Sequence, residues 1–488
     1  MIQAEQPQFA RSAIRGTAWR YLTFFSGKLM VLISMLVLAR LLSKDDFGVV
    51  GYAVTTIGFL DAMSDLGIAP AVIFFRDDEH APNTAFWLGL IISLILFALT
   101  WLCGPLIAAY FKDPRAGPVT QVLAITFPIS ALGNIHEALL RKKLAFGKTF
   151  IPDFVQALVK GGISILCAFL GFGPWSLIIG QISGAALAVI AFWLVTAWRP
   201  TLEFSRQTAI SLLNYGKSIV GVDLLGILLL NLDYLLVGRY LGPIALGIYI
   251  LGFRIPDLLI MQFSRILSTV IFPIYTKMRD VPGRLSKGFL STCRYVSLVT
   301  IPVGLGLALV ARPFVQVALT DKWMEAIPII QTISLYSMLL SLSYNAGSAY
   351  KAEGRPQVLT RLGLVRIALL LPALYWAVTV AKSIVVVGWM QVLVAFIGGT
   401  INLVAAARLL KLPFIKILDS LAPAMVAGSM LALVTFSTLR LTASMEPLSQ
   451  LVLASLAGGC VYILGLWFFF RKISLDLLAS FRSALQRG

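Results

Sequence analysis

The sequence predicts an all-α integral membrane protein with about 14 transmembrane helices, on the evidence of its composition and of its apolar runs. The chain has 488 residues, of which 59% are hydrophobic and only 13% charged, and its mean hydropathy is +0.89. A soluble domain of this length needs far less apolar surface. Stretches of about 20 apolar residues, the length that crosses a bilayer, recur between charged residues, glycines and prolines. The longest loops reach only about fifteen residues, so any function must lie among the helices.

Run length places the spans, because helices that are apolar on all sides show no periodicity. We expect them at residues 14–41, 47–75, 84–110, 119–140, 151–172, 174–198, 212–238, 244–278, 288–311, 327–350, 357–379, 384–409, 415–439 and 449–470. Residues 1–200 would form a first lobe of six helices, residues 201–411 a second, and residues 412–488 two further helices and a cytoplasmic tail.

Lysine and arginine in the loops predict the orientation in the membrane. With both termini in the cytoplasm, about 23 of the 40 basic residues lie inside, about 9 outside and about 8 within spans. The loop "LRKKLAFGK" carries much of this bias, whereas the acidic loop "RDDEH" does not contribute to it. The sequence therefore predicts a cytoplasmic-membrane protein. Its net charge of +18 reflects topology and contact with anionic lipid, and requires no nucleic acid.

No motif predicts an enzyme. Gly216, Lys217 and Ser218 spell the end of a phosphate loop, but Ser211 occupies the position of the required upstream glycine. The stretch "IHEALL" lacks the second histidine of a zinc-protease helix. The cysteines have neither pairing nor metal-ligand spacing and are expected to pack in apolar spans: Cys103, Cys167, Cys293 and Cys460. We therefore expect no ATP site, no metal and no catalytic residue.

The chain contains an internal repeat. "LARLLSKDDFGVVGY" is echoed by "VGRYLGPIALGIYIL", with Arg40 and Gly48 matching Arg239 and Gly247. "GPLIAAYFKD" is echoed by "RPFVQVALTD", and "LAFGK" by "KAEGR". The offset of about 200 residues corresponds to six helices, and an even number of spans preserves orientation, so the halves are predicted to be parallel repeats.

These segments also carry a resemblance. "LARLLSKDDFGVVGYAVTTIGFLDAMSDLGIAPAVIFFRD", "LVGRYLGPIALGIYILGFRIPDLL", "TVIFPIYTKMRD" and "LTDKWMEAIPIIQ" resemble, in order and spacing, the polysaccharide transporter branch of the MOP superfamily. The resemblance implies two six-helix lobes around a central cavity that opens alternately to the two membrane faces. It also implies a flippase for oligosaccharides carried on undecaprenyl pyrophosphate, working with polymerase and chain-length proteins in exopolysaccharide, capsule or O-antigen synthesis.

Two other functions remain open at this stage. A multidrug or cation antiporter of the same superfamily would need carboxylates to bind cationic drugs, whereas the deepest charge here is a lysine. A membrane polysaccharide polymerase or ligase usually has a long extracytoplasmic loop, and none is present in the sequence.

Charged residues inside spans are the candidate site, because they are costly in lipid unless they face water or a partner. Arg254 and Arg265 are eleven residues apart, about 20° around a regular helix, and are predicted to form a cationic ladder that binds phosphate. Pairing of Arg254 with Asp257 is the structural alternative. Three arginines near cytoplasmic ends are interpreted as topology residues: Arg294, Arg361 and Arg366.

Three lysines complete the predicted cationic set. Lys28 lies roughly 20 Å along the first helix, too deep to reach either surface, and Lys160 is nearly as deep. Lys217 is closer to a helix end. Lys28 is a substrate-binding candidate, with an ion pair to Asp61 or Asp65 as the alternative.

Buried carboxylates are candidates for coupling transport to H⁺ or Na⁺, because they can alternate between charged and neutral forms. Asp61 and Asp65 lie four residues apart, and the Gly67 and Pro70 that follow them are expected to break the helix. A structural role for this pair is the alternative. Asp223 and Asn231 are predicted to share one sector of the seventh helix.

Overall fold

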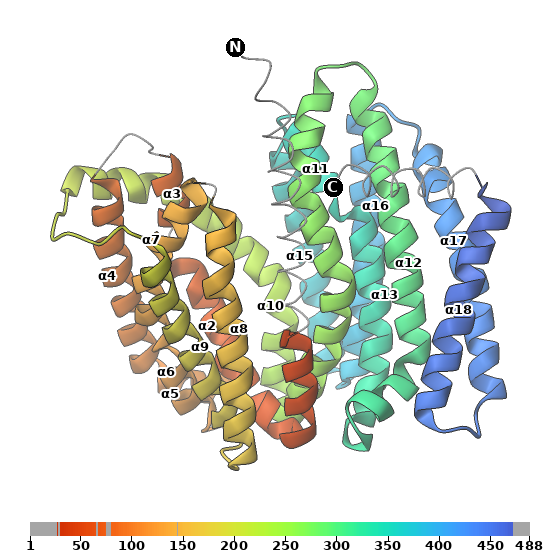
Figure 1. Ribbon diagram of the computed structural model, residues 1–488, viewed down its shortest axis with the longest axis horizontal. Helices are drawn as coiled ribbons and strands as arrows, with labels where there is room; N and C mark the ends of the chain where they lie inside the picture. Colours follow the sequence, from red (N-terminus) through yellow and green to blue (C-terminus); the bar gives the residue numbers. More distant parts are fainter. Residues whose placement is uncertain (1–26, 28–29, 65–66, 75–79, 144, 472–488) are drawn as a thin grey trace. The chain divides into compact units, whose positions relative to one another are not determined.

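The computed structural model describes residue 27 and residues 30–64, 67–74, 80–143 and 145–471, and every regular element within these ranges is a helix (Figure 1). Eleven of these described helices are long and apolar enough to cross a membrane, which confirms an all-helical multi-pass membrane protein. The chain divides into two compact units, Met1–Gly247 and Ile248–Arg487.

The first unit begins with the apolar helix Met30–Leu41. It continues with α2 (Lys44–Ser64), α3 (Ile68–Phe74), α4 (Ala81–Leu102), α5 (Gly104–Phe111), α6 (Ala116–Leu123), α7 (Thr126–Lys142), α8 (Phe146–Phe169), α9 (Trp175–Val195) and most of α10 (Arg206–Pro256). α8 and α9 pack closely because glycines face the contact: a Cβ on Gly180 would lie 2.7 Å from the Lys160 carbonyl oxygen.

The second unit begins with the last turns of α10. It continues with the π-helix η1 (Asp257–Met261), α11 (Gln262–Arg279), α12 (Arg284–Ala318), the 3₁₀-helix η2 (Asp321–Ala326), α13 (Ile327–Tyr344), α14 (Ala346–Ala352), α15 (Gln357–Thr379), α16 (Ile384–Leu409), α17 (Phe414–Leu441) and α18 (Pro447–Phe469). α12 packs against α13, α17 and α18, while α13 also contacts η1 and α16.

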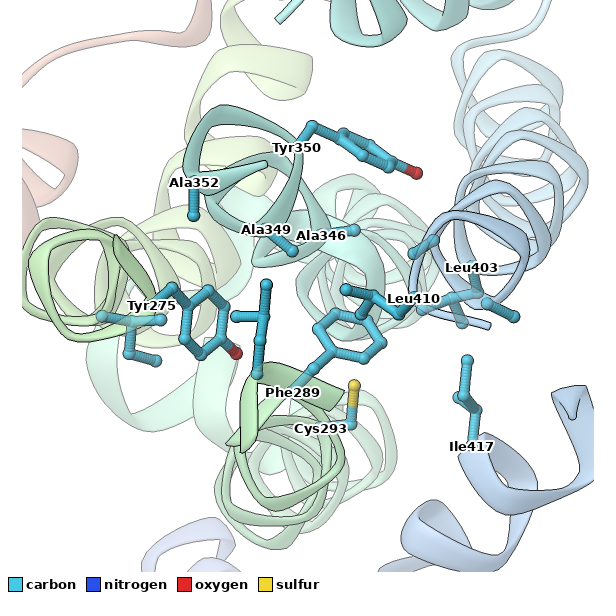
Figure 2. Packing of buried hydrophobic residues seen from close by; sticks show 14 of the residues in the cluster. Tyr275, Phe289, Cys293, Ala346, Ala349, Tyr350, Ala352, Leu403, Leu410 and Ile417 are labelled. Carbon is cyan, nitrogen blue, oxygen red and sulfur yellow. The ribbon is translucent and has the colours of Figure 1, made fainter. Parts of the chain in front are cut away.

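A buried apolar cluster anchors α11 in this unit (Figure 2). Tyr275 of α11 and Phe289 of α12 are nearly inaccessible to solvent, and the small side chains of Ala346 and Ala349 let α14 approach them. The Tyr350 hydroxyl donates a hydrogen bond of 2.7 Å to the Asn402 side-chain oxygen on α16. The cluster therefore fixes the C-terminal half of α11, the helix that carries Arg265 in its first turn.

The expected spans match the observed helices most closely in the second unit, where 357–379 and 384–409 coincide with α15 and α16. In the first unit a helix breaks inside the expected span 47–75. Gly67, with φ +66°, separates α2 from α3 as predicted, whereas Pro70 lies inside α3 and does not break it. Gly242, with φ +84°, interrupts α10 between the expected spans 212–238 and 244–278. The count of fourteen remains a prediction, because helix length and composition identify eleven.

The two echoed segments share one backbone feature but not one conformation. The residue before Asp113 and the residue before Asp321 both have positive φ, 57° at Lys112 and 90° at Thr320. Their ψ angles differ, 31° at Lys112 and 163° at Thr320, so the left-handed turn at Lys112 is not repeated at Thr320.

Within the first unit the two repeat motifs contact each other reciprocally. A Cβ on Gly48 would lie 1.8 Å from the Pro243 carbonyl oxygen, and a Cβ on Gly247 would lie 2.0 Å from the Lys44 carbonyl oxygen. The separation of Gly48 from Gly247 along the chain equals that of Lys44 from Pro243. Each contact therefore has its equivalent in the other repeat, and only glycine fits at either place. We call residues 44–48 and 243–247 the reciprocal glycine contact.

An ion-pair cluster fixes the segment between α5 and α6. Arg115 donates hydrogen bonds to Asp113 (2.9 Å) and to Asp45 (3.0 Å). Burial alone would raise the pKa of Asp113, but the hydrogen bonds and charge of Arg115 outweigh it and hold this pKa below its usual range. The same bonds raise the pKa of Arg115, so the guanidinium stays charged.

Candidate functional site

A π-helical turn lies in the middle of the predicted arginine ladder. α10 ends at Pro256, which has no backbone N–H to donate, and the next five residues form η1 before α11 resumes a regular helix. A π-turn inserts one extra residue into a helix and so shifts every later side chain by about 100° around the axis.

This shift brings Asp257 and Arg265 together. Residues eight apart differ by about 80° around a regular helix, and the inserted residue reduces this to about 20°. Arg265 accordingly donates two hydrogen bonds to Asp257, from Nη2 to Oδ1 at 2.7 Å and from Nη1 to Oδ2 at 3.3 Å. The Asp257 side chain is 10% exposed and that of Arg265 is 36% exposed. The pair is thus a bidentate, mostly buried ion pair.

The same shift separates Arg254 from Arg265 around the helix. The expected offset of about 20° becomes about 80°, so the straight ladder predicted from a regular helix is corrected. Arg254 is exposed and has no hydrogen-bond or ion-pair partner among the described residues. The expected alternative, a pair between Arg254 and Asp257, is also corrected, because Arg265 takes that carboxylate. Arg254 therefore keeps its full donor set for another anion.

Three predicted residues in the first unit have described side chains. Lys160 is exposed on α8, about two-thirds of the way along the helix. Asn231 is half-buried on α10 and donates its amide to the Ile227 carbonyl oxygen of the same helix at 3.0 Å. Asp61 is exposed near the end of α2. Their assignment to transport stays a prediction.

Four other predicted residues have side chains outside the described part of the structure. Lys28 and Asp65 lie outside the described residues. The backbone of α10 passes through Lys217 and Asp223, but their side chains are likewise outside the described part of the structure.

Arg366 is a deep cation that sequence reasoning missed by treating it as a topology residue. Its Nη2 donates a hydrogen bond of 2.8 Å to the Tyr336 hydroxyl, and its Cζ lies 6.0 Å from the centre of that ring. Arg366 is the tenth residue of α15 and Tyr336 the tenth of α13, both near midspan. Counting residues from the start of the expected span 357–379 would have revealed this depth.

The arrangement offers positive charge within the membrane-spanning part of the second unit. Arg265 is neutralised by Asp257, whereas Arg254 and Arg366 have no carboxylate partner among the described residues. Guanidinium groups present a planar fork that suits phosphate oxygens. Within the described residues, no three His, Cys, Asp or Glu side chains are grouped as metal ligands would be. The chemistry available here is therefore anion binding.

Two relatives resemble this chain over nearly their whole length. Teichuronic acid biosynthesis protein TuaB of Bacillus subtilis is 24% identical over 463 residues, which cover 94% of this chain and 95% of that protein. Succinoglycan biosynthesis transport protein ExoT of Rhizobium meliloti is 22% identical over 458 residues, which cover 93% of this chain and 92% of that protein.

A solved structure shares the fold. The lipid II flippase MurJ, in an inward closed conformation, superposes with a TM-score of 0.74 and 14% identity over 93% of this chain and 99% of that one. A family model described as "Polysaccharide biosynthesis protein" matches residues 37–328. These findings confirm the predicted resemblance. Since the family match covers more than half of the residues, the chain belongs to the polysaccharide biosynthesis protein family.

Proposed function

We propose that this protein is a flippase that moves oligosaccharides linked to undecaprenyl pyrophosphate across the bacterial cytoplasmic membrane, for exopolysaccharide, capsule or O-antigen synthesis. The observation that carries the proposal is that the family and the fold agree. The family and its relatives are named for polysaccharide biosynthesis or transport, and the fold is that of a lipid II flippase over 93% of the chain.

The deep cations of the second unit support the same proposal. The substrate carries a diphosphate between a prenyl tail and a sugar head, and the diphosphate is the part that must be held within the membrane. Arg254, which has no partner among the described residues, binds it, while Arg265 is held by Asp257 and contributes less. The prenyl tail stays in lipid while the head group crosses.

The remaining assignments belong to this proposal. The protein is a transporter and catalyses no covalent step. Both termini are cytoplasmic, and polymerase and chain-length proteins of the pathway act on the product. Lys28, Lys160 and Lys217 add positive charge along the route, and Asp223 couples the movement to H⁺ or Na⁺.

A deletion strain tests the proposal. We expect complete lipid-linked repeat units to accumulate on the cytoplasmic leaflet, and the wild-type gene to restore polymer export. Arg254→Ala should restore little export and Arg254→Lys part of it, because lysine keeps the charge but not the fork. Arg440→Ala is the control, since Arg440 stacks 5.0 Å from the ring centre of Phe436 on α17 and should restore export fully.

Three results would contradict the flippase. Truncated lipid-linked sugars would indicate a glycosyltransferase, and complete but unpolymerised units on the outer leaflet would indicate a polymerase. Unchanged lipids together with drug sensitivity would indicate a multidrug antiporter.

A further inference from the structure

Arg366 and Tyr336 form a contact near the middle of two helices of the second unit, α15 and α13. Each is the tenth residue of its helix, so each lies about 14 Å from the helix start, close to half of the hydrocarbon thickness of a bilayer. A guanidinium at this depth cannot reach the membrane surface by extending its side chain.

The environment of Arg366 orients the guanidinium but does not neutralise it. The Tyr336 hydroxyl accepts one hydrogen bond at 2.8 Å, and the Tyr336 ring lies beneath the charge at 6.0 Å. The buried Nε of Arg366 has no hydrogen-bond partner, and no carboxylate pairs with Arg366 among the described residues. Tyr336 itself is 4% exposed, so it is a fixed support.

Arg265 and Arg366 differ in their partners. Arg265 has a bidentate carboxylate partner eight residues earlier, whereas among the described residues Arg366 is bonded to the phenol hydroxyl of Tyr336 and to no carboxylate. An arginine has five N–H donors, so most of the donors of Arg366 are left for another acceptor. A charged group at this depth is costly to keep unless an anion or water completes its shell.

Arg366 also lies one aromatic ring away from the helical turn that carries the cation already assigned to substrate. The Tyr336 ring is 5.7 Å from the ring of Phe253, the residue that precedes Arg254, so a single aromatic ring separates the Arg366 guanidinium from Phe253. The π-helix η1 that follows Arg254 packs against α13, which carries Tyr336.

We propose that Arg366, oriented by Tyr336, binds the diphosphate of the lipid carrier together with Arg254. This inference rests on the proposed function and adds to it a binding residue, Arg366, and a positioning residue, Tyr336. A diphosphate offers more acceptor oxygens and more charge than a single phosphate, which two guanidinium groups match better than one.

The test measures binding of prenyl phosphates to the full-length protein in nanodiscs of zwitterionic lipid. The probes are farnesyl pyrophosphate, farnesyl phosphate and inorganic pyrophosphate. We expect wild type to bind farnesyl pyrophosphate most tightly, and Arg366→Ala to weaken that binding by about tenfold or more. Arg366→Lys should retain part of the affinity. Tyr336→Phe should lower the affinity for farnesyl pyrophosphate about threefold, because this change leaves the Arg366 charge in place but removes the hydrogen bond that orients the guanidinium.

Arg440→Ala is again the matched control, because Arg440 also lies over an aromatic ring. The affinity of this variant for farnesyl pyrophosphate should equal that of wild type. If wild type binds no prenyl diphosphate, the proposed function itself fails. If wild type binds and Arg366→Ala binds equally well, only the role of Arg366 is overturned. Competition by phosphatidylglycerol as strong as that by farnesyl pyrophosphate would also overturn it, since the site would then hold a membrane lipid. Should Arg366→Ala fail to fold, unchanged affinity in both Arg366→Lys and Tyr336→Phe would refute the role.

Discussion

Replacing Asp257 with asparagine should destabilise the protein by leaving Arg265 without its counter-charge. Two hydrogen bonds, at 2.7 and 3.3 Å, join these side chains, and the carboxylate is only 10% exposed. Breaking a fully buried pair costs about 3–5 kcal/mol. Because the Arg265 side chain is 36% exposed, water can solvate part of the stranded charge, and we expect a loss of about 2–3 kcal/mol.

The assay is unfolding of the purified protein by SDS in mixed micelles. Asp280→Asn is the control: Asp280 pairs with Arg279 near the end of α11 at 3.6 Å with both side chains largely exposed, so its loss should cost less than about 1 kcal/mol. Removing both partners in Asp257→Asn with Arg265→Gln should recover part of the stability lost in the single variant. If Asp257→Asn is no less stable than Asp280→Asn, or if the double variant loses the sum of the two single losses, the ion pair between Asp257 and Arg265 does not stabilise the protein.

Three further predictions concern the first unit. Gly48→Ala should lower the melting temperature, at a cost of about 1–3 kcal/mol, because its Cβ would overlap a backbone carbonyl. Gly58→Ala on the same helix has open space around it and should be neutral or stabilising, and equal melting temperatures for the two would contradict the close contact. Asp113 has a lowered pKa in the folded protein. Its ion pair therefore stabilises the protein at pH values above the ordinary aspartate pKa of about 3.8, and this stabilisation is lost as the pH falls through the pKa of the folded state. The difference in melting temperature between wild type and Asp113→Asn should therefore be constant above about pH 5 and vanish in stronger acid, and a difference that persists there would exclude this role. In a cysteine-free background, cysteine at Lys143 should be labelled only from the cytoplasm and cysteine at Lys44 only from outside, whereas labelling of both from one side would break the predicted parallel repeat.

Much of the fold follows from the sequence because lipid demands long apolar runs. The run 384–409 begins and ends where α16 does, because Lys382 before it and Lys411 after it have positive φ, a conformation outside the regular helix. The break at Gly67 was predictable too, because the structure needs φ +66° there and glycine adopts it without strain.

The candidate site was harder to predict because its geometry depends on a single inserted residue. Arithmetic at 100° per residue aligns Arg254 with Arg265, and nothing in the sequence except Pro256 indicates the π-turn that moves them apart. The pairing of Asp257 depends on the same turn. Arg366 was missed for a different reason: it was interpreted as a topology residue, although counting along its span gives its depth. Its contact with Tyr336 could not be predicted, because the tyrosine lies thirty residues earlier on another helix.

The reciprocal glycine contact has the form of an isologous dimer interface enclosed in one polypeptide. In a two-fold homodimer the same patch meets itself, so every contact occurs twice, and here Gly48 against Pro243 mirrors Gly247 against Lys44. A separation of the two segments that makes room for one added methyl group makes room for the other as well. Mutations at the two glycines are therefore energetically linked, with the second costing less than the first. A chain that arose by duplication would retain such a self-complementary patch only as long as both copies kept it.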